Sequence, residues 1–486
     1  MIDVGNALRA MKVGRSVAEQ DDDLDRYFIE TETFRALISG EKDIIAGDKG
    51  TGKSAIYRMI QQNYRTYPEL QDVEVISAFN PSGNPIFQRL ARETEYSEAS
   101  YQTLWKAFFL SFVGNWLLDV YGPEYTPDLK KLDALLGALG LKSQKPEVVT
   151  VFSNLLTVFK GLANPKRAYI DISVTETGMP IVSPGVEFGG DQQKREVVYA
   201  DDFLNVLECA LKSCDTTVWL ALDRLDEAFV GSPDIEKTAL RALLRSYLDM
   251  GNLSKLKLKL FLRRDLFRRV TSGGFVNLSH VNAMRTDIEW NDEDLLAMLA
   301  RRLLFNVEFS EAVGVSQDEP DKLFSILFPE QIDVGERKPN SQNWIMSRIR
   351  DGKGIRPPRN LIDLTIKARE NQVRRQQREP RDAVALSGPV IEADAVKEAH
   401  KQLSVIRVDD TLLAEAGPLA AKIQLFKDGQ SEHNQASLRQ VLENDPHFSE
   451  TVRALVEMGF LEEVGENYKI PMLYRHGINI TQGKAF

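Results

Sequence analysis

Eight consecutive residues near the amino end of the chain have the types and the spacing of a phosphate-binding loop. They follow the pattern G-x-x-x-x-G-K-[ST], as Gly47, Asp48, Lys49, Gly50, Thr51, Gly52, Lys53 and Ser54. Glycines let the backbone curl until several N–H groups face one anion, and a following helix adds the positive end of its dipole. We expect Lys53 to reach the β- and γ-phosphates of a nucleotide, Ser54 to bind Mg²⁺ through its hydroxyl, and Ala55 to complete the phosphate site. The alternative is a glycine turn that binds nothing.

An acidic run follows a short apolar segment in the middle of the chain. Val218–Leu222 is apolar throughout and leads directly into Asp223, which describes a buried strand that ends at a carboxylate. A carboxylate in that place can hold the Mg²⁺ shell, usually through water, and we assign this role to Asp223. Hydrolysis also needs a group that orients or deprotonates water, for which Glu227 is our first candidate and Asp226 our second. The alternative is an acidic helix start that caps its own backbone.

Three arginines have positions suited to the charge that builds up on a transferred phosphoryl group. Arg263 ends the last predicted strand of the first half and is our candidate for a contact with the γ-phosphate. Arg264 could instead face a neighbouring subunit and act in trans. Arg359 follows a pair of prolines near the first turn of a helix, where it could sense the phosphates. The alternatives are a surface ion pair with Asp265 and a solvated or salt-bridged Arg359.

Strands and helices alternate around these motifs, which predicts a parallel sheet with helices on both faces. The predicted strands are Asp43–Ala46, Val73–Ser77, Val218–Leu222 and Lys255–Leu262. The predicted helices include Lys53–Tyr64, Asp202–Ser213 and Glu236–Met250, and the opening segment Ala18–Thr31 also reads as helical. An antiparallel hairpin is expected between Arg167 and Phe188. The fold class is therefore α/β, with the sheet of a P-loop NTPase.

From Trp290 the pattern is helical to about Arg378. Asn291 and the acids after it predict a capped helix, and Glu379–Pro389 reads as a linker. Two further helices, Gln435–Glu443 and Phe448–Met458, then precede a hairpin, which is the order of a winged helix. We predict three domains: a P-loop NTPase core at 1–289, with a helical region at about 85–160 and a hairpin insert at about 166–188, a helical lid at 290–385, and a winged-helix-like domain at 390–486.

The composition is that of a soluble globular protein with several domains. The chain has 486 residues, is 43% hydrophobic and 27% charged, and carries a formal net charge of -10, which disfavours non-specific binding to nucleic acid. Its two cysteines, Cys209 and Cys214, are too few for a disulfide framework, and we expect buried structural thiols. No pair of its five histidines has helical metal spacing. Without a signal-peptide core, and with the most apolar run, Ala107–Val120, too short to span a bilayer, we expect a cytoplasmic protein with no membrane segment.

Taken together, these motifs resemble those of bacterial P-loop ATPases on the border of the AAA+ and STAND (NACHT-like) groups. The residues that carry the resemblance are Leu222–Glu227, Phe261–Arg263, Glu289-Trp290 before a helix ending in Ala300–Leu303, and Pro358–Ile362 in the lid. The opening also resembles a set of bacterial P-loop ATPases often encoded near restriction or phage-defence genes. The resemblance implies ATP as the nucleotide, Mg²⁺ as its ion, and a role in defence against phage. Arg263 stands where AAA+ proteins usually have a polar Asn or Thr. This departure from the AAA+ pattern favours a STAND-like switch over a fast motor.

Three functions stay open on the sequence. The first is Mg²⁺-dependent ATP hydrolysis that drives a conformational switch, with a homo-oligomer or a separate effector protein as the partner. The second is a nucleotide-gated scaffold with little turnover. The third is a DNA-acting ATPase, a loader or remodeller, that uses the basic residues after the lid arginine: Lys367, Arg369, Arg374, Arg375, Arg378 and Arg381. The second winged-helix helix offers Arg453 but also Glu450 and Glu457, so we expect that face to dock on protein rather than DNA.

Overall fold

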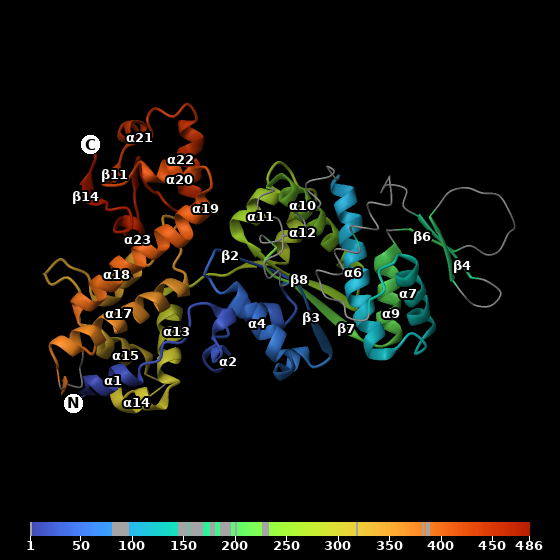
Figure 1. Ribbon diagram of the computed structural model, residues 1–486, viewed down its shortest axis with the longest axis horizontal. Coiled ribbons are helices and arrows are strands. Elements are labelled where there is room, and N and C mark those ends of the chain that lie inside the picture. Colours follow the sequence, from blue (N-terminus) through green and yellow to red (C-terminus); the bar gives the residue numbers. More distant parts are fainter. Residues whose placement is uncertain are drawn as a thin grey trace. The chain divides into compact units, whose positions relative to one another are not determined.

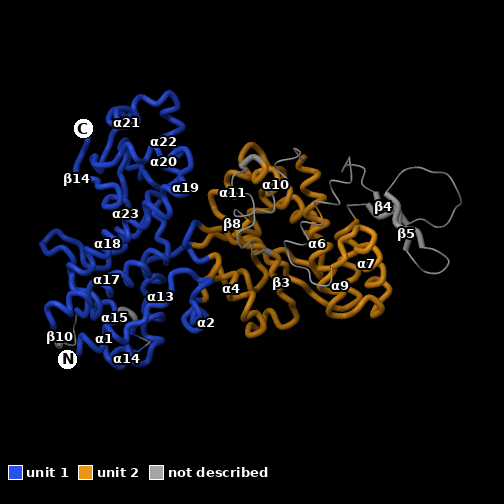
Figure 2. The backbone as a smooth tube through the Cα atoms, viewed as in Figure 1, with its two compact units in different colours: residues 1–29, 48–52, 289–486 blue, residues 30–47, 53–288 orange. Residues whose placement is uncertain are grey.

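The computed structural model of the chain consists of two compact units. It describes residues 2–79, 97–143, 155, 169–174, 180–184, 196–199, 202–225, 233–316, 319–381, 383–384 and 389–486. Unit 1 comprises residues 1–29, 48–52 and 289–486, and unit 2 comprises residues 30–47 and 53–288 (Figure 2). Each unit has a hydrophobic core of its own. The first 29 residues, which the sequence placed with the NTPase core, pack in unit 1.

Unit 2 contains a parallel sheet of five strands. In chain order they are β2 (Ile44–Gly47), β3 (Val73–Phe79), β7 (Thr217–Leu222), β8 (Leu256–Arg263) and β9 (Arg285–Asp287). Their order across the sheet is β3-β7-β8-β2-β9, and every neighbouring pair is parallel. All four residues of β2 are buried, as expected of a strand covered on both faces. The predicted α/β fold is confirmed, although β9 was not predicted.

Helices cover both faces of this sheet. The phosphate loop leads into α4 (Lys53–Asn63) on one face, and α10 (Pro233–Asp249), α11 (Arg264–Thr271) and α12 (Leu278–Ala283) lie on the other (Figure 1). The long helix α6 (Glu98–Tyr121) packs against α10, α9 (Phe203–Ser213) and α7 (Pro127–Ala138). Most of α6 is buried, which confirms the helix predicted for the most apolar run. Among the described helices, none is both long and apolar enough to cross a membrane.

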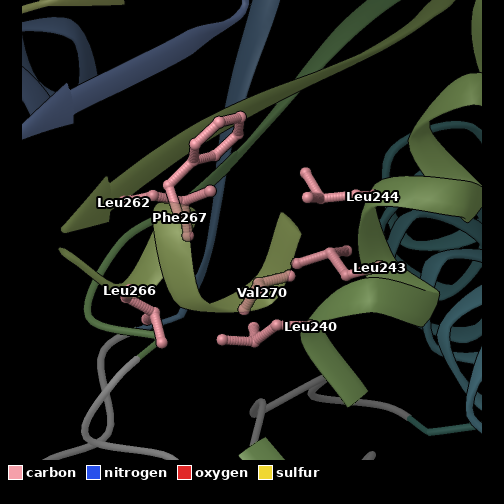
Figure 3. Close-up of a pocket in the computed structure, with 7 residues that line it drawn as sticks. All are labelled: Leu240, Leu243, Leu244, Leu262, Leu266, Phe267 and Val270. Atoms are coloured by element: carbon pink, nitrogen blue, oxygen red, sulfur yellow. The ribbon is translucent and has the colours of Figure 1, made fainter. Parts of the chain in front are cut away.

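Tight apolar packing fixes the carboxyl end of β8. A cavity of only about 10 Å³ lies between α10, β8 and α11 (Figure 3). Its lining is wholly apolar: Leu240, Leu243, Leu244, Leu262, Leu266, Phe267 and Val270. A void of this kind stays dry. Because Leu262 is part of this packing, the position of Arg263, the next residue, is set by the core rather than by a loop.

Shorter elements complete unit 2. They are α3 (Glu32–Ile38), the 3₁₀ turns Tyr64–Thr66, Pro68–Leu70 and Met250–Asn252, and three strands, β4 (Tyr169–Val174), β5 (Pro180–Pro184) and β6 (Glu196–Tyr199). The β4–β5 pair is antiparallel, as the predicted hairpin requires, and β6 adds an unpredicted third strand beside β4. Of the helical region expected at 85–160, α6 and α7 lie within the described residues. Cys209 is exposed, so the expectation of a buried thiol is wrong there.

Unit 1 begins with the amino end and continues through the lid. Its elements are β1 (Ile2–Asp3), α1 (Val4–Ala10), the 3₁₀ turn Ala18–Gln20, α2 (Leu24–Tyr27), α13 (Asp292–Leu304), α14 (Val307–Val313), α15 (Pro320–Leu327), α16 (Ser341–Arg348), α17 (Pro358–Arg378), β10 (Ala383–Val384) and α18 (Ala393–Arg407). The Asn291 side chain caps α13, as predicted. The helix expected over Ala18–Thr31 is wrong, because that segment holds only one 3₁₀ turn and a four-residue helix. β1 pairs with β10, inside the segment expected to be a linker.

A winged helix closes unit 1. A π-helical segment, Val408–Leu413, and α19 (Ala414–Ala416) join α18 to it. Its elements are α20 (Leu419–Gln424), β11 (Gln430–His433), α21 (Gln435–Val441), α22 (Phe448–Glu457), β12 (Glu462–Val464), β13 (Asn467–Lys469), α23 (Met472–Arg475) and β14 (Thr481–Lys484). The sheet order β12-β13-β11-β14 puts the predicted β12–β13 hairpin, the wing, at one edge. Strands β11 and β14 were not predicted.

Candidate nucleotide site

Four of the predicted site residues of unit 2 lie together. The strand β2 ends at Gly47, α4 begins at Lys53, and the Lys53 ammonium donates to the Gly47 carbonyl over 2.8 Å. The Ser54 hydroxyl donates to Asp223 Oδ2 over 3.2 Å. Parallel strands end at the same edge of a sheet, which is why Asp223, after β7, reaches the residues after β2. A hydroxyl and a carboxylate oxygen at this spacing fit the oxygen ligands that Mg²⁺ takes.

The backbone after β7 is shaped to hold the Asp223 carboxylate. Asp223 is 4% exposed, and Arg224 has φ 56°, a left-handed conformation that is uncommon for a residue with a side chain. Burial raises the pKa of Asp223 to about 6, although the backbone N–H of Arg224, the charges of Lys53 and Arg224, and the Ser54 hydroxyl all act to lower it. The charge of this carboxylate therefore remains costly despite its neighbours, so a bound cation would stabilise it.

This raised pKa gives the site a pH dependence. The ordinary value is 3.8, so the folded chain holds the Asp223 proton more tightly than the unfolded chain does. The contribution of this group to stability therefore falls as the pH rises from about 4 to about 6 and is constant above that range. A bound cation favours the ionised form, so we expect Mg²⁺ to bind more weakly as the pH falls below about 6. Thermal unfolding with and without Mg²⁺ and nucleotide, across this pH range, measures both effects.

The matched variant for this test is Asp223→Asn, which keeps the shape of the side chain and removes its titration. In the absence of Mg²⁺ we expect its stability to lose the dependence between about pH 4 and 6, and with Mg²⁺ we expect little added stabilisation at any pH. A wild-type chain whose Mg²⁺-dependent stabilisation is the same at pH 5 as at pH 8 would contradict the assignment.

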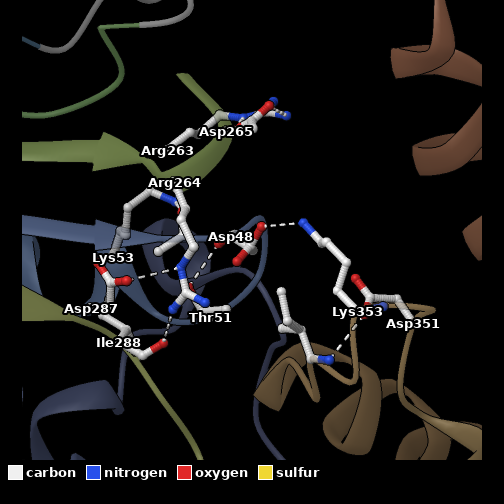
Figure 4. A network of polar contacts seen from close by, with 12 residues as sticks. Asp48, Thr51, Lys53, Arg263, Arg264, Asp265, Asp287, Ile288, Asp351 and Lys353 are labelled. Atoms are coloured by element: carbon white, nitrogen blue, oxygen red, sulfur yellow. Dashed lines mark hydrogen bonds and ion pairs between the residues drawn. The ribbon is translucent and has the colours of Figure 1, made fainter. Parts of the chain in front are cut away.

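The arginines at the end of β8 and the start of α11, Arg263 and Arg264, are bonded to other groups of unit 2 (Figure 4). Arg263 forms a two-bond ion pair with Asp265, at 3.1 Å from Nε and 3.0 Å from Nη2. This is the alternative that the sequence left open for it. Arg264 pairs with Asp287 at 3.3 Å and donates to the Ile288 carbonyl over 3.3 Å, and its side chain is 14% exposed. The structure therefore shows Arg264 in contact with β9 of its own chain, and its role in trans stays a prediction.

The central residues of the phosphate loop, Asp48–Gly52, belong to unit 1 and are bonded there. Asp48 Oδ1 lies 2.7 Å from the Lys353 ammonium, and Lys49 forms an ion pair with Glu415. The Trp290 indole N–H donates to the Thr51 carbonyl over 2.8 Å. The loop therefore has three side-chain contacts with the lid and the segment after it, and none of the three partners was predicted as a site residue.

Arg359 lies beside the same loop. Gly50 has φ +78°, and a Cβ built on it would lie 3.2 Å from the Cβ of Arg359, so the close approach of the lid helix α17 requires glycine. Burial, followed by the charge of Arg407, lowers the pKa of Arg359, while Asp363, Glu19 and Glu415 oppose this. Its Nε is buried without a hydrogen bond among the described residues. The structure therefore places Arg359 against the phosphate loop, and its contact with phosphate oxygens stays a prediction.

Two predicted residues, Asp226 and Glu227, lie outside the described residues, so their roles stay predictions. Three site residues were missed: Lys353, Glu415 and Trp290. The turn Asp351–Gly354, a lysine between two glycines, was the available signal for Lys353, and Trp290 stood only among the residues of the family resemblance. Glu415 had no local signal, since its partner Lys49 is far away in sequence.

Two surfaces were candidates for contact with nucleic acid: the basic helix of the lid and the winged helix. Of the six basic residues after the lid arginine, Lys367, Arg369, Arg375 and Arg381 bond to groups of unit 1, and Arg374 and Arg378 are exposed. On the winged helix, Glu450, Arg453 and Glu457 of α22 are exposed, as are Glu463 and Glu466 of the wing. This face is net acidic, as the sequence indicated. No group of three or more metal-ligating side chains occurs within the described ranges.

Comparisons with known proteins give similarity at the level of structure only. No protein-family model matches the chain, and no curated protein matches it in sequence. Among solved structures, it is similar to the ORC2 protein of Aeropyrum pernix in its ADPNP–ADP complexes, with 14% identity, 92% of this chain and 90% of that chain covered, and a TM-score of 0.37. The ORC1 protein of the same organism in complex with DNA has 11% identity, 96% coverage of both chains and a TM-score of 0.37. Cdc6p of Pyrobaculum aerophilum has 13% identity, coverage of 94% and 97%, and a TM-score of 0.30. The fold assignment therefore rests on the sheet order and the phosphate loop of this chain.

Proposed function

We propose that the chain is a Mg²⁺-dependent ATPase whose hydrolysis cycle drives a conformational switch. The observation that carries the proposal is the hydrogen bond of 3.2 Å between Ser54 and the buried Asp223, at the start of the helix that Lys53 begins. A buried carboxylate with a raised pKa, next to a hydroxyl and a lysine, matches the needs of a cation and of the phosphates it accompanies.

Each residue has one task in this proposal. Lys53 binds the β- and γ-phosphates, and Ser54 with Asp223 holds Mg²⁺, which neutralises charge on the phosphates. Glu227, or Asp226 in its place, orients the attacking water. Arg359 contacts phosphate oxygens from the lid. Arg263 leaves Asp265 when the γ-phosphate offers it a more highly charged partner, so that its positive charge meets the charge that develops during transfer.

Release of phosphate from ATP tests the proposal. We expect steady release by the wild type in Mg²⁺, none in excess chelator, and a loss of roughly 100-fold or more for Glu227→Gln, in line with the removal of a group that activates water. Asp226→Asn separates the two candidates, because only the residue that orients water should abolish turnover without weakening ATP binding. Glu450→Gln, an exposed glutamate on the winged helix, is the matched control. No release by the wild type under any condition would overturn the enzymatic proposal.

We also propose a pathway and a partner for the chain. The resemblance to bacterial ATPases near defence genes is the support for an antiphage role with a homo-oligomer or a separate effector as partner. A DNA-acting ATPase is the runner-up, supported by the exposed Arg374 and Arg378 and opposed by the acidic face of the winged helix. Stimulation of phosphate release by duplex DNA, falling steeply with salt, would favour the runner-up.

A further inference from the structure

We propose that residues 350–355 of the lid couple the phosphate loop to the winged helix, with Lys353 as the residue that responds to bound nucleotide. The inference rests on the proposed function, because it takes ATP and ADP as the two ligands of the loop. Every contact that carries it lies within unit 1. The segment, which we call the coupling loop, lies between α16 and α17 and contacts both the phosphate loop and the wing.

The contact with the phosphate loop is an ion pair. The Lys353 ammonium lies 2.7 Å from Asp48 Oδ1, and the side chains are 23% and 13% exposed (Figure 4). Asp351 fixes the backbone at this point, since its Oδ1 accepts the N–H groups of Lys353 and Ile355 over 2.9 Å each. A partly buried pair on a loop that is itself hydrogen-bonded is screened less by solvent than a surface pair.

The contact with the winged helix is made by the backbone of Gly352, where a larger side chain would not fit, and by one ion pair. The Gly352 N–H donates to the Gly459 carbonyl over 2.7 Å, and a Cβ on Gly352 would lie 2.5 Å from the Leu461 carbonyl oxygen. Arg350 pairs with Glu462, the first residue of β12, at 3.0 Å. A movement of Lys353 is therefore passed to the start of the wing without a flexible linker between them.

A second ion pair joins the phosphate loop to the segment that leads into the winged helix. Lys49 pairs with Glu415 of α19, directly after the π-helical segment Val408–Leu413. π-Helical turns occur frequently at functional sites. Val408 in turn packs on the backbone of Gly477, where a Cβ would lie 2.5 Å from the Val408 side chain. Two charged residues of the phosphate loop thus link it to the winged helix: Asp48 through the coupling loop, and Lys49 through α19, which leads into the winged helix.

The two pairs must respond to phosphate in opposite ways. The phosphates of ATP add negative charge next to Asp48, which makes the positive charge of Lys353 more favourable and tightens the coupling loop. The same phosphates attract Lys49 and compete with Glu415 for it, which loosens the second pair. Because coupling is reciprocal, removal of the Lys353 charge must weaken ATP binding, whereas removal of the Glu415 charge must not.

The test is hydrogen exchange at the coupling loop and the wing, with binding measured on the same samples. For the wild type with a non-hydrolysable ATP analogue, we expect slower exchange at Gly352 and at residues 459–464 than with ADP, by roughly tenfold for a charge contact of this kind. In Lys353→Met the difference between the two nucleotides should disappear, and in Lys353→Arg, which keeps the charge, it should remain. Lys401→Met removes a lysine from an exposed pair with Glu398 in the same unit and is the matched control.

Calorimetric titration with the same analogue supplies the second readout. Lys353→Met should bind it roughly tenfold more weakly than the wild type, and Glu415→Gln should bind it as tightly or more tightly, a difference in sign that two merely structural contacts would not give. If the wild type binds the analogue but exchange is the same in both nucleotides, the coupling is overturned and the proposed function stands. If the wild type binds neither nucleotide, the coupling and the proposed function are both overturned. A weaker Glu415→Gln would overturn the opposed response of the two pairs.

Discussion

The Lys53→Ala variant is expected to bind ATP roughly 100-fold more weakly than the wild type. Removal of the ammonium takes away charge-assisted hydrogen bonds to two phosphate groups, a loss of about 3 kcal/mol. The fold should survive, because in the free chain Lys53 bonds to the Gly47 carbonyl at a partly buried position. Isothermal titration gives the affinity directly, and mass analysis of the purified protein should find ADP or ATP in the wild type alone.

Thermal unfolding provides an independent check on the same variant. A ligand at 100 times its Kd stabilises the folded state by about 2.7 kcal/mol, so saturating ATP with Mg²⁺ should raise the Tm of the wild type and leave that of Lys53→Ala nearly unchanged. Lys130→Ala, which removes an exposed lysine from the same unit, should respond as the wild type does. Equal shifts in all three proteins would show that the stabilising ligand binds elsewhere.

The elements around this candidate site that the sequence predicted correctly are those whose evidence is local. The phosphate loop depends on eight adjacent residues, and the strand before Asp223 on five adjacent apolar ones. The wing hairpin and the two helices before it also have local signals in their turns and their apolar spacing. In each case the interactions that define the element lie within a few residues of one another, so the pattern alone was sufficient.

The parts that were missed depend on partners distant in sequence. β9 is three residues long, Arg285-Thr286-Asp287, and has no apolar alternation, so only its pairing with β2 reveals it as a strand. The ion pair of Arg264 with Asp287 could not be foreseen either, because the two residues are brought together only by the pairing of β9 with β2. The first 29 residues read as part of the NTPase core because they precede it, yet Val13 and Asp21 bond to Arg302 in the lid.

The contacts of the phosphate loop with the lid were also missed because the partners are distant in sequence. Its variable residues Asp48 and Lys49 carry charge, and charge at a variable position says nothing about the partner. The structure supplies Lys353 and Glu415, each separated from the loop by most of the chain. The sequence therefore predicted the phosphate loop itself, and the structure was needed to show which side chains of the lid and of the segment after it contact that loop.

A large loss of stability is expected for Asp43→Ala, at the opposite end of β2 from the phosphate loop. Asp43 pairs with Lys259 of β8 at 2.6 Å, and the Lys259 side chain is 1% exposed. Tyr247 donates to the other carboxylate oxygen over 2.9 Å, and the Lys259 ammonium lies 3.7 Å from the centre of the Trp219 ring. Removal of the carboxylate leaves a buried ammonium without its counter-charge, which costs about 3–5 kcal/mol and lowers the Tm by roughly 10 °C.

The double variant Asp43→Asn/Lys259→Met separates the cost of an unpaired charge from the value of the pair itself. Because desolvation of two ions offsets much of their attraction, a neutral replacement should be more stable than Asp43→Ala by about 2 kcal/mol or more, as measured by chemical denaturation. An equally unstable double variant would show that the pair itself stabilises the unit. The Asp43 carbonyl also accepts the Leu260 N–H over 2.8 Å, at the point where β2 and β8 come into register. That register sets Gly47 opposite Arg263, so this buried pair holds the two strand ends that present the phosphate loop and its candidate arginine.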